Sequence, residues 1–328
     1  MSLELLEYRE EMATDWDTFC ARAVNATLLH TRRFLSYHGE RFTDASLVLV
    51  EDGRWVGLLP AARVPGNPSI IVSHPGATFG GLVHDGRLLG HRTIDALSAA
   101  TSYFAARGVT TLLYKPLPSI YPLLPAQDDL YALFRLHARR VRCDLSSTID
   151  LSARRPPSER RRRALKKAHK SVAVEVGGPR LPDLWAIVED NLDRKYGARA
   201  VHSPAEMAEL ARRFPDAIRS LVALVDGRVE AGVILFLSSR VWHAQYIASS
   251  ERGYELSALD AVFDRALQDA TAMGARYFDF GTSNEDEGRV LNDGLYRFKS
   301  EFGGGGAAYE TYELDLAAGA PSDGHACS

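Results

Sequence analysis

The chain has 328 residues, a formal net charge of -3, 46% hydrophobic residues and 25% charged residues. These values are typical of a soluble globular protein and exclude a chain that coats nucleic acid along its whole surface. The cysteines Cys20, Cys143 and Cys327 are too scattered for a disulfide framework or a cysteine metal site, which fits a cytoplasmic protein. The acidic N-terminus lacks a signal-peptide core, and no apolar run approaches the roughly 20 residues of a membrane span, so no membrane contact is expected.

The first half of the chain predicts strands and helices around a β-hairpin. Apolar strands flank Asp52-Gly53-Arg54, and Asp-Gly favours the tight turn of a hairpin. A proline-rich run at 116–122 predicts a rigid loop that contains Tyr121. The expected elements are strand 3–8, helix 14–25, helix 32–38, the hairpin 46–64, strand 69–72, helix 92–107, and strands 110–115 and 142–150.

A strongly basic helix is predicted between the halves. Ser158 suits the N-cap of a helix that reads ERRRRALKKAHK, and positive charge on nearly every face would repel itself without anionic partners. Two interpretations stay open: the helix contacts polyphosphate or an RNA backbone, or it is a solvated linker neutralised by acidic groups elsewhere. The residues predicted to contact tRNA or another anion are Arg160, Arg161, Arg162, Arg163, Lys166, Lys167 and Lys170.

The second half predicts a strand that opens into a polar loop. The strand Tyr277–Phe280 stops at Gly281, and residues rich in Asn, Asp and Glu follow. Ligands commonly bind where a buried strand of an α/β fold ends in this way. Lys299, among aromatic residues, is suited to stabilise developing negative charge; the alternative is a surface lysine on an amphipathic helix. The expected elements are strand 172–176, helices 182–195 and 204–214, the meander 220–249, helix 256–273, strand 276–280, a helical turn at 296–302 and strand 309–316.

The two halves are predicted to be copies of one unit. Residues 46–54 (SLVLVEDGR) resemble residues 220–228 (SLVALVDGR), and each hairpin is followed later by a helix, a glycine and a strand. Because the strands form consecutive meanders, mixed sheets are expected rather than a Rossmann domain. The predicted divisions are a first domain at 1–153, a basic linker helix at 154–171, a second domain at 172–316 and a disordered tail at 317–328.

With this duplication, the chain resembles the tandem GNAT-fold proteins of the FemABX type, which are aminoacyl-tRNA-dependent peptidyltransferases. The resemblance covers about residues 1–316 and implies an α/β (α+β) fold with mixed sheets in two GNAT-like domains. The stretches that carry it are RRRRALKKAHKSVAVEV (160–176), NLDRKYG (191–197), YFDFG (277–281) and GLYRFKSEFG (294–303).

The resemblance also suggests functions for individual residues. In the family, a lysine in a Phe-Lys-x-x-Phe-Gly setting lies in the substrate channel, and Lys299 holds that place. A basic residue in the first long helix of the second half lies near substrate, and Arg194 matches it. In the first half the family often has a tryptophan followed four residues later by lysine. Phe34 and His38 stand in those places, so the chain departs from the pattern there.

Further candidates come from the residues themselves. Asp279 alternates with two phenylalanines, so it points away from them, either toward the acceptor amine or into a structural hydrogen bond. Alternation predicts that His243 and Gln245 share a face with Ile247, and a core histidine is the alternative. Glycines at 76, 80 and 81 would allow close approach of a ligand, unless they form a plain turn. The remaining substrate-binding candidates are Tyr37, His38, His74, Tyr121, Arg194, Tyr196, His202, Asn284, Tyr296, Phe298 and Phe302.

The loop 249–258 bears on the acyl donor. GNAT domains that use acetyl-CoA bind its pyrophosphate in a glycine-rich turn at a helix N-terminus. This loop has Gly253 as its one glycine, and Glu251 and Glu255 would oppose a pyrophosphate. The corresponding stretch 84–90 fits no better. The sequence therefore favours a donor other than CoA.

The resulting hypothesis is an aminoacyltransferase in antibiotic or cell-wall precursor synthesis. It would move an amino acid from aminoacyl-tRNA to a small peptide-like or nucleotide-linked amine, as a monomer without cofactor or metal. Lys299 and Asp279 are its predicted catalytic residues. Two alternatives stay open: an acyl-CoA-dependent N-acyltransferase acting on an amino sugar or polysaccharide precursor, and a binding protein for an anionic ligand.

Overall fold

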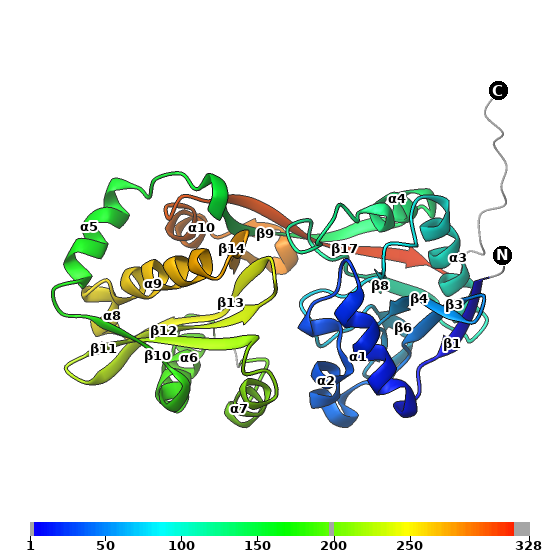
Figure 1. Ribbon diagram of the computed structural model, residues 1–328, viewed down its shortest axis with the longest axis horizontal. Coiled ribbons are helices and arrows are strands. Elements are labelled where there is room, and N and C mark those ends of the chain that lie inside the picture. The colour runs from blue at the N-terminus through cyan, green and yellow to red at the C-terminus, as the bar shows by residue number, and fades with distance from the viewer. Residues whose placement is uncertain (1–2, 197–199, 318–328) are drawn as a thin grey trace. The chain divides into compact units, whose positions relative to one another are not determined.

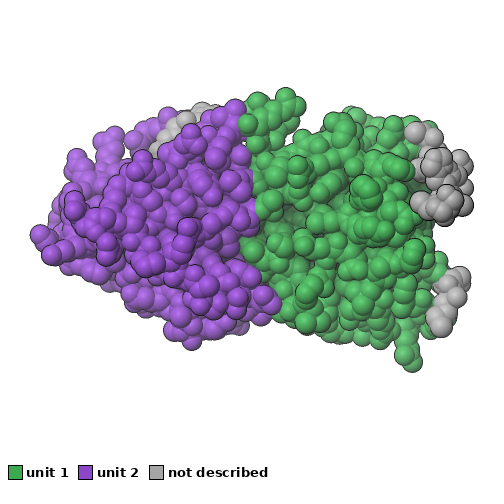
Figure 2. Space-filling view, turned by 90° about the horizontal axis from the view of Figure 1, so that it is seen from above, with its two compact units in different colours: residues 1–144, 286–289, 308–328 green, residues 145–285, 290–307 purple. Residues whose placement is uncertain are grey.

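The computed structural model describes residues 3–196 and 200–317, and the chain divides into two units (Figure 1). Unit 1 comprises residues 1–144, 286–289 and 308–328, and unit 2 comprises residues 145–285 and 290–307 (Figure 2). All but the first residue of the predicted tail, 317–328, lies outside the described residues. Among the described residues, no helix combines the length and the apolar character that crossing a membrane requires.

Unit 2 is built on a mixed sheet with the strand order β10-β11-β12-β13-β14-β9. The first four strands form an antiparallel meander, β14 is parallel to β13, and β9 is antiparallel to β14. Helix α9 covers one face of this sheet, and α6 and α7 cover the other (Figure 1). The elements are α5 (Glu159–Ala168), β10 (Ala173–Val176), α6 (Leu181–Tyr196), α7 (Pro204–Arg213), β11 (Ile218–Val225), β12 (Arg228–Leu237), β13 (Val241–Ser249), α8 (Glu251–Glu255), α9 (Ala258–Ala272), β14 (Tyr277–Thr282), β15 (Asn284–Glu285), β16 (Val290–Leu291) and α10 (Asp293–Ser300).

Unit 1 contains an antiparallel sheet in the order β1-β3-β4-β7 and a second run of strands in the order β17-β8-β6-β5-β2. One core packs α3 and α4 against β3, β4, β6 and β8, and a smaller one packs α1 against the other face of β3 and β4. The elements are β1 (Leu3–Glu7), α1 (Ala13–Arg22), α2 (Arg32–Leu35), β2 (Thr43–Asp44), β3 (Leu47–Glu51), β4 (Arg54–Leu59), β5 (Ala62–Val64), β6 (Asn67–Val72), β7 (Val83–His84), α3 (His91–Ala105), β8 (Thr111–Tyr114), α4 (Asp128–Arg135), β9 (Arg139–Asp150) and β17 (Gly305–Asp315), the last two of which are shared between the units.

The predicted duplication is confirmed by matching backbone geometry in the two units. Both hairpin turns have two residues of positive φ, 48° and 72° at Asp52-Gly53 and 48° and 78° at Asp226-Gly227. This is the left-handed pair that a two-residue hairpin turn requires. Helices α3 and α9 are both followed by a glycine with a φ of 78°, Gly108 and Gly274. The parallel pair β6–β8 repeats the parallel pair β13–β14.

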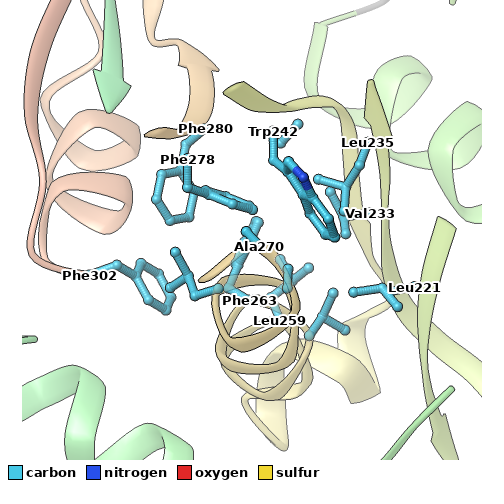
Figure 3. Close-up of a cluster of buried hydrophobic side chains, with 14 of the residues drawn as sticks. Leu221, Val233, Leu235, Trp242, Leu259, Phe263, Ala270, Phe278, Phe280 and Phe302 are labelled. Carbon is cyan, nitrogen blue, oxygen red and sulfur yellow. The ribbon is translucent and has the colours of Figure 1, made fainter. Parts of the chain in front are cut away.

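The core of unit 2 lies between α9 and the sheet and is rich in aromatic side chains (Figure 3). Phe278 and Phe280 point from β14 toward Phe263 on α9, whose ring centroid lies 4.8 Å from that of Phe280. Phe302 stacks on Phe280 at 5.3 Å, and such buried aromatic pairs add about 0.5–1.5 kcal/mol each beyond their burial. This packing fixes the face of β14, so Asp279 points to the opposite side, as predicted.

The units do not end where the sequence predicts. The predicted linker helix at 154–171 is α5, which lies inside unit 2 and packs on α9. The end of the predicted second domain, 308–315, belongs to unit 1, where Tyr312 pairs with Tyr114 of β8. Pairing between strands so far apart in sequence leaves no local signal, which is why a boundary near residue 153 was expected.

One predicted helix begins later than expected, and one helix of the structure was not predicted. The helix expected at 256–273 begins at Ala258, because Ser257 is left-handed (φ 58°) and separates α9 from the short α8. Helix α4 (Asp128–Arg135) is absent from the expected elements. It starts after an exposed stretch, and its first turn carries two aspartates that favour a helix N-terminus.

The predicted alternation along β13 is wrong at Gln245. Ile234 pairs with Tyr246 and Leu235 with Ala244, so Gln245 is the extra residue of a β-bulge. A bulge reverses the faces of all residues beyond it. Ile247 therefore packs on the core below α9, whereas Tyr246 contacts Trp185 of α6 at a ring distance of 5.1 Å.

Candidate active site

The last rung at which β13 and β14 pair carries His243 and Asp279. The parallel pairing covers only the rungs that begin at Val241–Tyr277 and end at His243–Asp279, although both strands run on beyond it. His243 Nδ1 lies 2.7 Å from Asp279 Oδ2. The two side chains thus meet where the parallel pairing of β13 and β14 ends and the two strands separate.

Asp279 is completely buried, and its second oxygen is held by hydrogen bonds. Thr148 Oγ1 donates to Oδ1 at 3.0 Å, the Gly281 backbone N–H donates to it at 3.3 Å, and Ser146 Oγ donates to it as well. A buried carboxylate needs such partners, because the loss of hydration is otherwise costly. With three donors on Oδ1, the carboxylate is fixed in plane, and Oδ2 faces His243.

Lys299 approaches the same strand end from α10. Its side chain is 4% exposed, and Nζ donates to the carbonyl oxygens of Gly281 (3.0 Å) and Thr282 (2.6 Å). Burial lowers the pKa of Lys299 from 10.5 to about 8, and the charge of Asp279 partly opposes this shift. The alternative of a surface lysine is therefore wrong.

Several candidates next to Lys299 have structural positions. Phe302 is buried in the core, and Phe298 packs on it with ring centroids 5.5 Å apart, so both rings have structural contacts in addition to their predicted contact with substrate. Asn284 accepts a hydrogen bond from the Leu145 backbone N–H at 2.6 Å and so joins β15 to β9. Tyr296, on α10, is half-buried.

Other candidates lie on the α6 side of unit 2. His202 is buried, and its Nδ1 lies 2.6 Å from the hydroxyl of Tyr246, whose pKa is raised to about 12 by burial. Arg194 pairs with Asp190 at 2.8 Å and with Glu251 at 3.2 Å. The side chain of Tyr196 lies outside the described residues.

The first-half candidates form an aromatic cluster within unit 1. The ring of His38 lies 3.9 Å from that of Tyr37 and 5.0 Å from that of His74. Burial lowers the pKa of His74 to about 2, so it is neutral at ordinary pH. A Cβ at Gly76 would lie 2.0 Å from His38 Nε2, so this glycine admits an imidazole ring rather than the predicted ligand.

Tyr121 lies apart from that cluster in the contacts the structure describes. It is buried, and its hydroxyl lies 3.0 Å from the hydroxyl of Tyr309, a residue of β17 within the same unit. Its ring also packs 4.7 Å from that of Phe79. The hydroxyl pair joins the proline-rich loop to β17, so Tyr121 has a structural contact in addition to its predicted role.

The arginines of α5 have acidic partners within unit 2. Arg161, which is 11% exposed, donates to both oxygens of Asp260 at 2.8 and 3.0 Å and lies 3.3 Å from Glu301. Burial raises the pKa of Asp260 to about 6 even though Arg161 opposes the shift. Arg160 pairs with Glu301, and Arg162 and Arg163 pair with Glu159. The exposed positive charges that remain on this segment are Lys166, Lys167 and Lys170, and their contact with an anion stays a prediction.

Substitution of Gly281, at the carboxyl end of β14, tests whether the backbone conformation there affects stability and turnover. Gly281 and Gly274 have φ values of 77° and 78°, so alanine at either should destabilise the chain equally, by about 1–2 kcal/mol. A Cβ at Gly281 would make ordinary van der Waals contacts, 3.4 Å from the Ala244 carbonyl oxygen and 3.6 Å from His243 Cε1, and a Cβ at Gly274 would lie in open space. The backbone of Gly281, unlike that of Gly274, is hydrogen-bonded to Asp279 and Lys299.

We therefore expect Gly281→Ala to lower turnover by on the order of 10- to 100-fold, because relief of the left-handed strain would shift the N–H that donates to Asp279 and the carbonyl oxygen that accepts from Lys299. Gly274→Ala should leave turnover unchanged. Urea unfolding and steady-state kinetics on the two variants measure both quantities. Equal turnover in the two variants would contradict a role for the Gly281 backbone in holding Asp279 and Lys299.

Sequence reasoning did not find Ser146 and Thr148, which hold Asp279. Their spacing of two residues on β9 places both hydroxyls on one face, but nothing in the sequence pairs that strand with β14. The contact between His243 and Asp279, which are 36 residues apart, was likewise not predicted from the sequence.

The comparisons with known proteins agree with this architecture. The family described as "Acetyltransferase (GNAT) domain" matches residues 152–299. No curated protein sequence matches the chain. FemX has a TM-score of 0.69 at 12% identity, over 96% of this chain and 98% of FemX. L-PGS from Bacillus licheniformis has a TM-score of 0.61 at 14% identity, over 95% and 93%. A tandem GNAT protein from the clavulanic acid biosynthesis pathway has a TM-score of 0.53 at 13% identity, over 98% and 100%.

Identities this low show likeness of fold, and the predicted resemblance and fold class are confirmed at that level. The family match covers the part of the chain in which His243, Asp279 and Lys299 come together. The chain therefore has the FemX-like tandem GNAT fold, and residues 152–299, most of which lie in its second unit, are similar to an acetyltransferase (GNAT) domain.

Proposed function

We propose that the chain is an aminoacyltransferase that moves an amino acid from aminoacyl-tRNA to the amine of a small peptide-like or nucleotide-linked acceptor. The product would be an amide, of the kind found in antibiotic or cell-wall precursors. The choice of donor rests on the buried carboxylate of Asp260 at the start of α9. Acetyl-CoA-dependent GNAT domains bind pyrophosphate at this position.

The positive end of α9 already holds a carboxylate of the chain itself. Asp260 lies in the first turn, is 4% exposed and is bonded by Arg161. The preceding loop forms α8, whose glycine, Gly253, is packed so closely that a Cβ there would lie 2.3 Å from the Glu230 carbonyl oxygen. A helix N-terminus attracts an external phosphate through unsatisfied N–H groups and a positive field. Asp260 occupies that field, which supports a donor without pyrophosphate.

Lys299 supplies the electrostatic part of the proposed chemistry. Attack of an amine on the aminoacyl ester produces a tetrahedral intermediate with a negative oxygen. Nζ of Lys299 makes two hydrogen bonds to carbonyl oxygens of β14, and an ammonium group has a third N–H to donate. Positioned donors of this kind contribute about 10²–10³-fold to turnover.

The second candidate is an acyl-CoA-dependent N-acyltransferase acting on an amino sugar or polysaccharide precursor. The match of residues 152–299 to an acetyltransferase domain favours it. It would need a way to bind CoA that does not use the start of α9, because Asp260 fills that place.

A labelled transfer assay separates the two candidates. The purified chain is incubated with a panel of amines and either total tRNA charged with radiolabelled amino acids or radiolabelled acetyl-CoA. We expect labelled amide from charged tRNA, abolished when the tRNA is first digested with ribonuclease. Product from acetyl-CoA that is indifferent to ribonuclease would contradict the proposed donor.

A further inference from the structure

The hydrogen bonds around Asp279 fix the tautomer of His243. Oδ1 of the carboxylate accepts from Thr148, Ser146 and the Gly281 backbone, and Oδ2 faces His243 Nδ1 at 2.7 Å. An ionised carboxylate only accepts hydrogen bonds, so Nδ1 must carry the proton. The basic lone pair of the neutral ring is therefore on Nε2. This is the arrangement by which an aspartate orients a histidine base in acyl-transfer enzymes.

We propose that His243 is the general base that removes a proton from the acceptor amine, with Asp279 as the residue that positions its ring. The proposal rests on the proposed amide-forming reaction, whichever acyl donor that reaction uses. An acceptor amine arrives mostly protonated near neutral pH, and an ammonium group has no lone pair with which to attack.

The internal duplication provides a comparison for this rung. In unit 1 the matching third rung of the parallel pair carries Val72 and Leu113, where unit 2 carries His243 and Asp279. In both units this rung pairs two parallel strands, and in unit 1 it does so with two apolar side chains. A fully buried aspartate with its three donors and a histidine is therefore not required by the architecture. It is a property of unit 2 alone.

The surroundings of the ring suit proton transfer. Gly281 lies beside Cε1, the ring carbon between Nδ1 and Nε2, so this neighbour presents no side chain to the ring. On β12, Phe236 pairs with His243 and carries no charge. Lys299 interacts electrostatically with Asp279, and its Nζ donates to two carbonyl oxygens of β14. Further along β13, Tyr246 is bonded to His202 and its raised pKa keeps it neutral.

The step balances without any further reagent. His243 Nε2 takes one proton from the ammonium group and passes it to solvent. The neutral amine attacks the ester carbonyl carbon, so that a C–N bond forms and the carbonyl oxygen becomes negative beside Lys299. The C–O bond to the ribose then breaks, and the second proton lost by nitrogen, taken up by Nε2, is delivered to the leaving ribose oxygen. The products are an amide, a tRNA with a free hydroxyl and one released proton.

Kinetics of a His243→Gln variant test the role of the base. The donor is charged total tRNA, the acceptors are glycinamide and glucosamine, and the control is His91→Gln, an exposed histidine of unit 1. We expect kcat to fall about 10²–10⁴-fold near pH 7 with little change in KM. The deficit should shrink as the pH rises above the pKa of the acceptor amine, because the amine then arrives neutral. A deficit that stays constant over that range would overturn the proposal.

Nitrogen-15 NMR of the histidine ring gives a second measurement that needs no substrate. We expect the Nδ1–H tautomer in the wild-type chain, and an Nε2–H tautomer there would also overturn the proposal. The donor hypothesis fails separately: if transfer occurs from acetyl-CoA and not from charged tRNA, the same variant and pH series with acetyl-CoA tests His243 just as directly.

Discussion

Replacing Asp279 with asparagine is expected to lower kcat by about 10³–10⁴-fold while the chain stays folded. Three donors surround the Oδ1 position, from Thr148, Ser146 and the Gly281 backbone, so the amide oxygen must take that place. The amide NH₂ then faces His243 Nδ1, which must accept a hydrogen bond instead of donating one. The ring proton moves to Nε2, and the base loses its lone pair on the side where it is needed.

Steady-state kinetics and the nitrogen-15 spectrum of His243 measure the two parts of this prediction together. Asp183→Asn, at an exposed aspartate in the first turn of α6, is the matched control and should keep wild-type turnover. If Asp279→Asn kept the Nδ1–H tautomer and still lost turnover, the carboxylate would have a role other than positioning the ring.

Replacing Lys299 with methionine is expected to lower turnover by about 10²–10³-fold and to change how stability depends on pH. In the folded chain the pKa of Lys299 is lowered to about 8, from its ordinary value of 10.5, mainly by burial. Between these values the unfolded chain binds a proton that the folded chain has released, so the free energy of unfolding rises with pH. The shift corresponds to about 3 kcal/mol, gained between pH 8 and 10.5 and absent below pH 8.

Methionine has no proton to bind, so Lys299→Met should lack this rise. Urea unfolding of both proteins from pH 7.5 to pH 10 measures the difference. The pKa of Lys115 is also lowered to about 8, but Lys115 is present in both proteins and its effect cancels. Parallel stability curves for the two proteins would mean that the folded chain accommodates the charge of Lys299 without penalty.

The order of hairpin, helix and strand in each unit could be predicted because short stretches of sequence mark each of these elements. Two Asp-Gly turns and two helices that end near a glycine are short-range signals, and each appears in both units at the expected place. Lys299 and Asp279 were singled out from local patterns too, since the first lies in a stretch that resembles the family and the second alternates with two core phenylalanines. Their catalytic roles stay predictions.

The features that the sequence did not predict depend on contacts between segments that are far apart in the chain. The bulge at Gln245 reverses the faces of β13, and nothing in the run of residues marks it. The charge of α5 left open an external anion or acidic partners within the chain, and nothing in the sequence identified Asp260, 99 residues away, as the partner of Arg161. His243 was a substrate-binding candidate with a core histidine as the alternative, and its contact with Asp279 depends on the parallel register of two strands, which the sequence does not show.

The way the chain divides between the units has a consequence for synthesis on the ribosome. Strand β8 of unit 1 pairs with β17, and the residues that it pairs with are made after every segment of unit 2. Until they emerge, the β8 edge of the N-terminal half has exposed N–H and C=O groups. Unit 2 can complete its sheet first, because its own segments end at residue 307. The unit whose synthesis begins first is therefore the one that finishes folding second, and a chain stopped before residue 308 would leave it without its closing strand.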